Sequence, residues 1–144
     1  MPVLQLYLVA DAYPAENLDS LLKEASDFYV QAMYPDTVPP PIERVRAFIC
    51  NIEDRHWATG GVPISQGGKL APYFTCMALA GRPAEQIEAM ANGLTHLLAK
   101  HLACDASIVR GQVISIPPDH WFIGGEPASR LRGVEIAKRA DTQS

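Results

Sequence analysis

Residues 72–86 read PYFTCMALAGRPAEQ, which predicts a strand followed by the start of a helix. The strand is expected from Tyr73 to Leu79, where the residues are apolar or aromatic. A first helical turn tolerates Pro83, and Glu85 suits the positive end of a helix dipole. Apolar residues then recur at helical spacing, which predicts a long amphipathic helix. They are Ile87, Met90, Ala91, Leu94, Leu97, Leu98 and Leu102.

The same order of elements occurs earlier in the chain. A strand is predicted from Val3 to Val9, and a second helical stripe follows it, made of Leu18, Leu21, Leu22, Ala25, Tyr29, Ala32 and Met33. The segment Pro14-Ala15-Glu16 returns 69 positions later. Five further residues return 64 positions later: Arg46, His56, Trp57, Gly60 and Gly61 recur as Arg110, His120, Trp121, Gly124 and Gly125. The chain is therefore read as an internal duplication.

Each half is predicted to close with a second strand, over Arg44 to Ile52 and over Ile108 to Ile116. The change of offset arises from the connection before that strand, because YPDTVPPPIE at 34–43 is longer than DASI at 105–108. The repeats are placed at 2–66 and 72–132, with a glycine-rich linker at 60–71. The tail at 133–144 has no firm pattern, and one domain is expected over 1–144.

Two strand-helix-strand units predict an α/β (α+β) fold with a four-stranded mixed sheet and both helices on one face. The other face of the sheet would then be uncovered. The first strand is apolar on both sides, with Leu4, Leu6 and Leu8 on one face and Val3, Tyr7 and Val9 on the other. We therefore expect another subunit to cover the open face.

Composition excludes several classes of protein. The chain has 144 residues, of which 48% are hydrophobic, and a formal net charge of -4 without any run of basic residues, so a nucleic-acid partner is not expected. No apolar stretch approaches the roughly 20 residues that span a bilayer, so no membrane partner is expected. The start MPVLQLYLVADAYP lacks the features of a signal peptide, which predicts a cytoplasmic protein.

No metal or cofactor is expected either. His96 and His101 are five residues apart, which is off the spacing that puts two ligands on one helix face, and no glycine-rich phosphate motif occurs. The cysteines are odd in number and widely separated, which fits neither a disulfide framework nor a zinc site. We expect buried, reduced thiols at Cys50, Cys76 and Cys104.

The second half resembles the 4-oxalocrotonate tautomerase family of the tautomerase superfamily. The resemblance rests on residues 72–86, on VRGQVISI at 109–116 and on HWFIGGEPASRLR at 120–132. The first half is similar more loosely, through PVLQLYLV at 2–9, RVRAFICNI at 44–52 and HWATGG at 56–61. The chain thus looks like a fused pair of short subunits. The resemblance implies the tautomerase (MIF-like) fold and a homotrimer of fused chains.

In that family a processed N-terminal proline acts as a base, and two arginines hold the substrate carboxylate. By resemblance Pro2 matches the base, because removal of Met1 would leave a secondary amine. Such an amine has a reference pKa of about 8, and an apolar pocket with a nearby guanidinium would keep it neutral. Arg82 matches the first arginine. Arg110 matches the second, and Arg46 holds the equivalent place in the first half, so either could reach Pro2.

The two halves differ at the matching positions. Pro72 is an internal imide with no basic nitrogen, and Tyr13 stands in the first half where the second has Arg82. This complementary loss predicts one composite site per chain. Trp121 and Trp57 match an aromatic residue that lines the pocket of the family.

The resemblance implies a cofactor-independent tautomerase that moves a proton between enol and keto forms of small 2-hydroxydienoates or arylpyruvate enols. One alternative is a dehalogenase, hydratase or decarboxylase in which Pro2 acts as an acid and a carboxylate activates water. The candidate carboxylates are Glu53, Asp54, Asp119 and Glu126. An alternative of another class is a non-catalytic module that binds a small acid or supports assembly.

Overall fold

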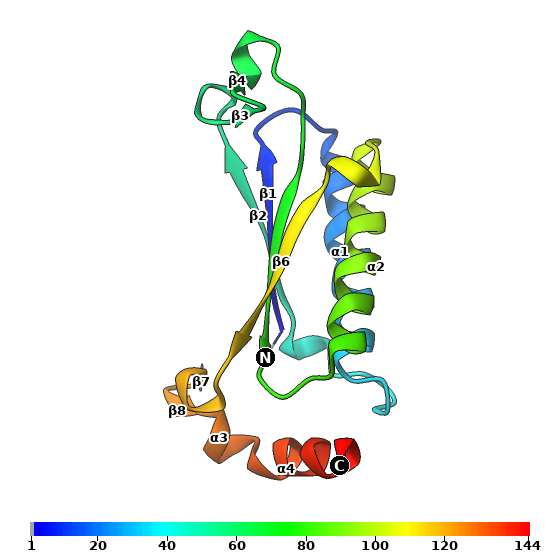
Figure 1. Ribbon diagram of the computed structural model, residues 1–144, viewed down its shortest axis with the longest axis vertical. Coiled ribbons are helices and arrows are strands. Elements are labelled where there is room, and N and C mark those ends of the chain that lie inside the picture. The colour runs from blue at the N-terminus through cyan, green and yellow to red at the C-terminus, as the bar shows by residue number, and fades with distance from the viewer. Residues whose placement is uncertain (1) are drawn as a thin grey trace.

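The computed structural model describes residues 2–144, and it arranges them as a sheet covered on one face by two long helices (Figure 1). The elements of these two layers are β1 (Val3–Val9), α1 (Ala15–Met33), β2 (Arg46–Ile52), β5 (Tyr73–Leu79), α2 (Ala84–Leu102) and β6 (Arg110–Ile116). Short 3-10 turns are η1 (Ile42–Arg44), η2 (Asp54–His56), η3 (Ile64–Gln66), η4 (Ala106–Ile108) and η5 (Pro118–His120). The remaining elements are β3 (Ala58–Thr59), β4 (Val62–Pro63), β7 (Phe122–Ile123), β8 (Glu126–Pro127), α3 (Ala128–Leu131) and α4 (Gly133–Gln143).

The sheet has the strand order β2-β1-β5-β6, which confirms the predicted four-stranded mixed sheet. The strands of each repeat pair in parallel, β1 with β2 and β5 with β6. The two repeats meet through β1 and β5, which are antiparallel and place Val3 opposite Met77 and Tyr7 opposite Tyr73. Antiparallel joining puts the start of one repeat and the strand-to-helix turn of the other at the same end of the sheet.

Several boundaries differ from the sequence prediction. The closing strands begin at Arg46 and Arg110, two residues later than expected, because η1 and η4 occupy the preceding residues. The helices begin at Ala15 and Ala84, since each preceding proline has extended backbone angles and serves as the N-cap. The tail without a firm pattern forms the helix α4.

The core lies between the sheet and the helices. Alternation along β1 and β5 directs every second side chain toward the helices. The buried side chains are Leu4, Leu6 and Leu8 of β1, Phe74, Cys76 and Ala78 of β5, Leu21, Ala25 and Tyr29 of α1, and Met90, Leu94 and Leu98 of α2. Packing is tight at Gly111 of β6, where a Cβ atom would lie 2.3 Å from the ring of Phe74.

The opposite face of the sheet is open within the chain. Val3 and Tyr7 are half-buried on it, but Val9, expected there, is only 4% exposed. The aromatic ring of Phe48 on β2 is 46% exposed. The rings of Tyr7 and Tyr73 lie 5.5 Å apart between centroids. An exposed sheet face with this many aromatic groups is typical of a surface that another subunit covers.

The three cysteines are unpaired, but burial was predicted wrongly for two of them: Cys76 is buried, whereas Cys50 and Cys104 are half-buried. In the described part of the chain, no helix combines the length and apolar character that crossing a bilayer requires.

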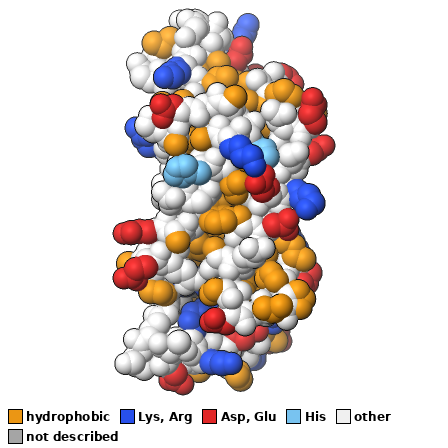
Figure 2. Space-filling view, turned by 90° about the vertical axis from the view of Figure 1, so that its right-hand side faces the viewer, with side chains coloured by type: hydrophobic (Ala, Val, Ile, Leu, Met, Phe, Trp, Pro, Cys, Tyr) orange, Lys and Arg blue, Asp and Glu red, His pale blue; other side chains and the backbone are white. Residues whose placement is uncertain are grey.

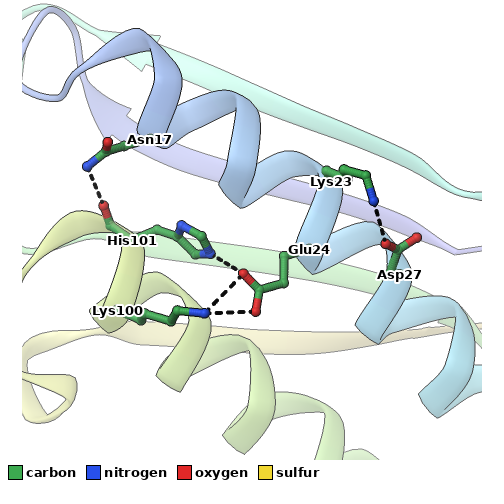
Figure 3. Close-up of polar contacts among 6 residues, drawn as sticks. All are labelled: Asn17, Lys23, Glu24, Asp27, Lys100 and His101. Carbon is green, nitrogen blue, oxygen red and sulfur yellow. Dashed lines mark hydrogen bonds and ion pairs between the residues drawn. The ribbon is translucent and has the colours of Figure 1, made fainter.

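The outer surface of the two helices carries charged side chains around a central strip of hydrophobic ones (Figure 2). One charged cluster joins the helices to each other. Glu24 of α1 contacts both Lys100, at 3.0 Å, and His101 of α2, and the side chain of His101 is only 12% exposed (Figure 3). Nearby, Lys23 and Asp27 form an ion pair within α1.

The Glu24 cluster predicts a pH-dependent contribution to stability. Hydrogen bonds from Lys100 and His101 lower the pKa of Glu24 below its ordinary value of 4.5. Its contribution is therefore present above that value and is lost as the pH falls through the lowered pKa. The variant Glu24→Gln is expected to unfold at a lower urea concentration than the unmodified protein at pH 7, and the gap is expected to close in acid. The matched control is Asp27→Asn, which removes a carboxylate from the same helix without a contact to α2. Equal effects of the two variants at pH 7 would contradict the prediction.

Candidate functional site at the Pro2 end of the sheet

The two opening prolines lie at opposite ends of the sheet in equivalent settings. Both are buried. The carbonyl of Pro2 accepts the backbone N–H of Arg46 at 3.0 Å, and the carbonyl of Pro72 accepts that of Arg110 at 3.1 Å. The two prolines therefore have equivalent backbone surroundings. The two ends of the sheet differ in their side chains, and only the nitrogen of Pro2 could become a terminal amine.

Arg82 lies at the same end of the sheet as Pro2. Its strand β5 runs antiparallel to β1, so the turn that follows β5 comes back beside the start of β1. Gly81 makes this turn with φ of 97°, a backbone conformation that glycine adopts without strain. The structure therefore places the proline that could become a terminal amine and the arginine retained by the other half at the same end of the sheet.

The guanidinium of Arg82 is poorly solvated. One nitrogen donates to the carbonyl of Met33 at 2.9 Å, while Nε is shielded from solvent with no hydrogen-bond partner within residues 2–144. Burial, with a smaller contribution from the charge of Arg139, lowers the pKa of Arg82 to about 10. The side chain stays cationic at pH 7, and it lacks the counter-ion that a buried charge ordinarily has.

A cavity of about 590 Å³ opens beside Arg82. Its walls come from the end of α1, the loop that follows it, the start of α2, and α4. Two guanidinium groups lie close to the ring of Tyr34, that of Arg44 at 5.3 Å and that of Arg82 at 6.0 Å from its centre. Pro2 is not among the residues that line this cavity, although it lies at the same end of the sheet.

The two candidate second arginines lie at different ends. Arg46 begins β2 opposite Val3, so it is at the Pro2 end, whereas Arg110 begins β6 opposite Tyr73, at the far end. Both side chains are exposed, and each donates to carbonyls of its own preceding turn: Arg46 to Glu43 at 2.8 Å and Arg110 to Ser107 at 2.6 Å. Within one chain only Arg46 shares an end with Pro2.

The tryptophans are divided in the same way. Trp121 follows β6 and lies at the Pro2 end in the segment that leads to β7 and β8, while Trp57 follows β2 at the far end (Figure 1). Trp57 donates its indole N–H to Thr59 at 3.2 Å. The hairpin of β3 and β4 and the hairpin of β7 and β8 extend from opposite ends of the sheet (Figure 1). The two indoles are therefore not brought together within the chain.

Most residues of this cavity were not anticipated as site residues from the sequence, among them Tyr34, Arg44 and Arg139. Tyr34 belongs to the connection at 34–43, which the sequence marked only as a loop insertion, and Arg44 was expected to begin the closing strand. Arg139 belongs to the tail, for which no element was predicted. The retained arginine at position 82 was the only strong signal in this region.

The charged residues around the cavity suit an anionic ligand. Four cations line the cavity, Arg44, Arg82, Lys138 and Arg139, against two carboxylates, Asp36 and Glu135. Across residues 2–144, the structure contains no group of three or more His, Cys, Asp or Glu side chains that could hold a metal ion. A guanidinium that is short of acceptors suits a carboxylate oxygen.

Curated relatives match about half of the chain. The chain is 33% identical over 61 residues to the 2-hydroxymuconate tautomerase of Pseudomonas sp. (strain CF600), which covers 42% of this chain and 97% of that protein. It is also 33% identical over 66 residues to the 2-hydroxymuconate tautomerase of Pseudomonas fluorescens, covering 46% of this chain and 95% of that protein. Since nearly the whole of each relative matches less than half of this chain, the comparison agrees with a duplicated unit. No protein-family model matches the chain.

Solved structures match over most of the length. Native fused 4-OT superposes with a TM-score of 0.80 and 24% identity, over 90% of this chain and 98% of that one. The R7 fused 4-OT wild type asymmetric trimer has a TM-score of 0.74 and 25% identity over the same shares. Macrophage migration inhibitory factor from Oncomelania hupensis has a TM-score of 0.71 and 15% identity, over 99% of this chain and 95% of that one. These matches confirm the predicted fold class.

Proposed function

Because this chain belongs to the tautomerase superfamily as a fused protein of the 4-oxalocrotonate tautomerase type, we propose that it is a cofactor-independent tautomerase whose base is the nitrogen of Pro2. The observation that carries the proposal is the shared position of Pro2 and Arg82, one from each repeat, at a single end of the sheet. The substrate is a small 2-hydroxydienoate or the enol of an arylpyruvate. The substrate to test first is 2-hydroxymuconate, after which the two relatives are named.

The reaction moves one proton and needs no other reactant. After removal of Met1, the neutral secondary amine of Pro2 takes the proton of the 2-hydroxyl group as the C–O bond becomes a carbonyl. The electron pair shifts along the diene of the substrate, and the protonated amine donates the proton to a carbon atom of the substrate. Arg82 holds a carboxylate of the substrate and stabilises the negative charge that develops on the enolate.

The surroundings of Pro2 support a neutral amine. Pro2 is buried, and burial disfavours the charged form of an amine. Arg82, Arg44 and Arg139 line a cavity at the same end of the sheet. A positive charge that came close to the amine would lower its pKa further.

The second arginine comes from either of two places. Arg46 reaches the Pro2 end within its own chain, while Arg110 reaches a Pro2 site only from a neighbouring subunit. We expect the assembly to be a homotrimer, as three fused 4-OT structures are trimers, and the open face of the sheet gives such an assembly its interface. Trp121 and Trp57 would then meet substrate, if at all, across subunit boundaries.

The proposal predicts a rate that rises with pH. A base must be unprotonated, so kcat/KM for 2-hydroxymuconate is expected to rise about tenfold per pH unit below the pKa of Pro2 and to level off at or below about pH 8. The measurement is the initial rate of enol loss from pH 5 to 9, with the uncatalysed rate subtracted at each pH.

Two outcomes would contradict the base mechanism. A rate that falls over the same range would favour the acid mechanism of a dehalogenase, hydratase or decarboxylase. Absence of turnover with 2-hydroxymuconate and with phenylpyruvate enol, in protein shown by intact mass to lack Met1, would favour a non-catalytic module.

A further inference from the structure

The C-terminal helix α4 lines the cavity and makes polar contacts near both of its ends. Near its start, the carboxylate of Glu135 accepts two hydrogen bonds from Arg44, at 3.1 and 3.2 Å. Near its end, the side chain of Gln143 donates to the carbonyl of Gly81 at 2.9 Å. Gly81 directly precedes Arg82, so α4 is attached to the turn that carries that arginine.

One polar face of α4 lines the cavity. Its cavity-lining residues recur three or four apart, as residues on one face of a helix do: Glu135, Lys138, Arg139, Thr142 and Gln143. Of the two large apolar residues of this helix, Val134 is 85% exposed and Ile136 is half-buried. The helix therefore contributes mainly polar and charged side chains to the cavity.

Two guanidinium groups in this cavity each have one buried nitrogen without an acceptor. Nε of Arg82 and one terminal nitrogen of Arg139 are shielded from solvent and have no hydrogen-bond partner among residues 2–144. Glu135 of α4 accepts from Arg44 and lies 3.7 Å from Arg132, and among residues 2–144 no hydrogen bond joins it to Arg82 or Arg139. The positive charge of Arg139 also lowers the pKa of Arg82. An anion between the two arginines would supply the missing acceptors and relieve the repulsion.

We infer that Arg139 is a further substrate-binding residue, which together with Arg82 holds one carboxylate group of the ligand in the cavity beneath α4. The inference rests on the proposed function for the identity of the ligand as substrate. Helix α4 is then part of the substrate site, and Arg139 contributes to the preference for substrates that carry a carboxylate. The pair of Glu135 and Arg44 positions the helix.

Binding of an unreactive acid tests the inference without turnover. Benzoate, which has no enolisable carbon, is titrated into the full-length protein by calorimetry at constant ionic strength. The variant Arg139→Gln is expected to bind benzoate about tenfold more weakly, the effect of losing one charge-assisted hydrogen-bonding partner. The matched control is Arg55→Gln, which removes the same group from the exposed turn η2 at the far end of the sheet. Its affinity for benzoate is expected to be unchanged.

A second readout separates binding from chemistry. With 2-hydroxymuconate, Arg139→Gln is expected to raise KM while kcat changes less than twofold, since Arg139 holds substrate and transition state alike. Undiminished benzoate affinity in Arg139→Gln, with an unchanged melting temperature, would overturn the inference. Failure of the proposed function appears differently, as absent turnover by the unmodified protein, and leaves the calorimetric comparison intact.

Discussion

A chain that carries one additional glycine before Pro2 is expected to lose about 10³-fold in kcat toward 2-hydroxymuconate, within the range that a general base contributes. The added peptide bond turns the nitrogen of Pro2 into an imide, which has no basic lone pair. This chemical state is the one that Pro72 already has inside the chain. Substitution of Pro2 by alanine is a weaker test, because it leaves a primary amine that can still accept a proton.

The duplication supplies the control. Pro72 is buried and accepts a backbone hydrogen bond from Arg110, as Pro2 does from Arg46, but its nitrogen belongs to a peptide bond, so we expect no role for it in proton transfer. Pro72→Ala is therefore expected to change kcat by less than threefold. Initial rates are compared after intact-mass analysis has established the N-terminal residue of each protein. Full turnover by the glycine-extended chain would remove Pro2 from the mechanism.

The fold was predictable because the duplication repeated every signal. Each half has a strand, a helix with an apolar stripe, and a second strand. Right-handed crossovers pair the two strands of each half in parallel, and joining the halves gives a mixed sheet. Even so, the sequence did not locate the boundary at Arg46 or Arg110. A 3-10 turn ends where local hydrogen bonds give way to the ladder, and this change leaves no periodic pattern.

The site was only half predictable from the sequence. Pro2 and Arg82 were predicted as site residues through resemblance, and antiparallel pairing of β1 with β5 places them at one end of the sheet. Helix α4 was not predicted, because its 11 residues include only two large apolar ones, Val134, which is 85% exposed, and Ile136, which is half-buried. Hydrophobic periodicity is a weak signal in so short and polar a helix.

The same limit applies to the second arginine. Arg46 and Arg110 occupy equivalent positions in the two repeats, and each has the same local hydrogen bonds to its own preceding turn. Equivalent local structure cannot distinguish their roles. Their roles depend on which Pro2 site each arginine reaches in the assembled oligomer, and the sequence of a single repeat does not contain that information.

The second large effect is expected at Arg82. The variant Arg82→Gln is expected to lower kcat/KM for 2-hydroxymuconate about 100-fold, because it removes a fixed charge from a poorly solvated site where charge develops in the transition state. Arg82→Lys retains the charge but loses the planar fork that binds a carboxylate through two hydrogen bonds. It is expected to recover only part of the loss. Both variants are measured by initial rates over a range of substrate concentration.

Two controls separate this catalytic loss from a loss of folding. Arg82 donates to the carbonyl of Met33, so the melting temperature of each variant is measured alongside its rate. The matched substitution is Tyr13→Phe at the equivalent position of the first repeat, which is expected to leave kcat/KM within twofold of the unmodified value. If Tyr13→Phe and Arg82→Gln reduced the rate equally, the two ends of the sheet would be functionally alike. A composite site with one active end requires that they differ, since only the Pro2 end joins a potential amine to a retained arginine.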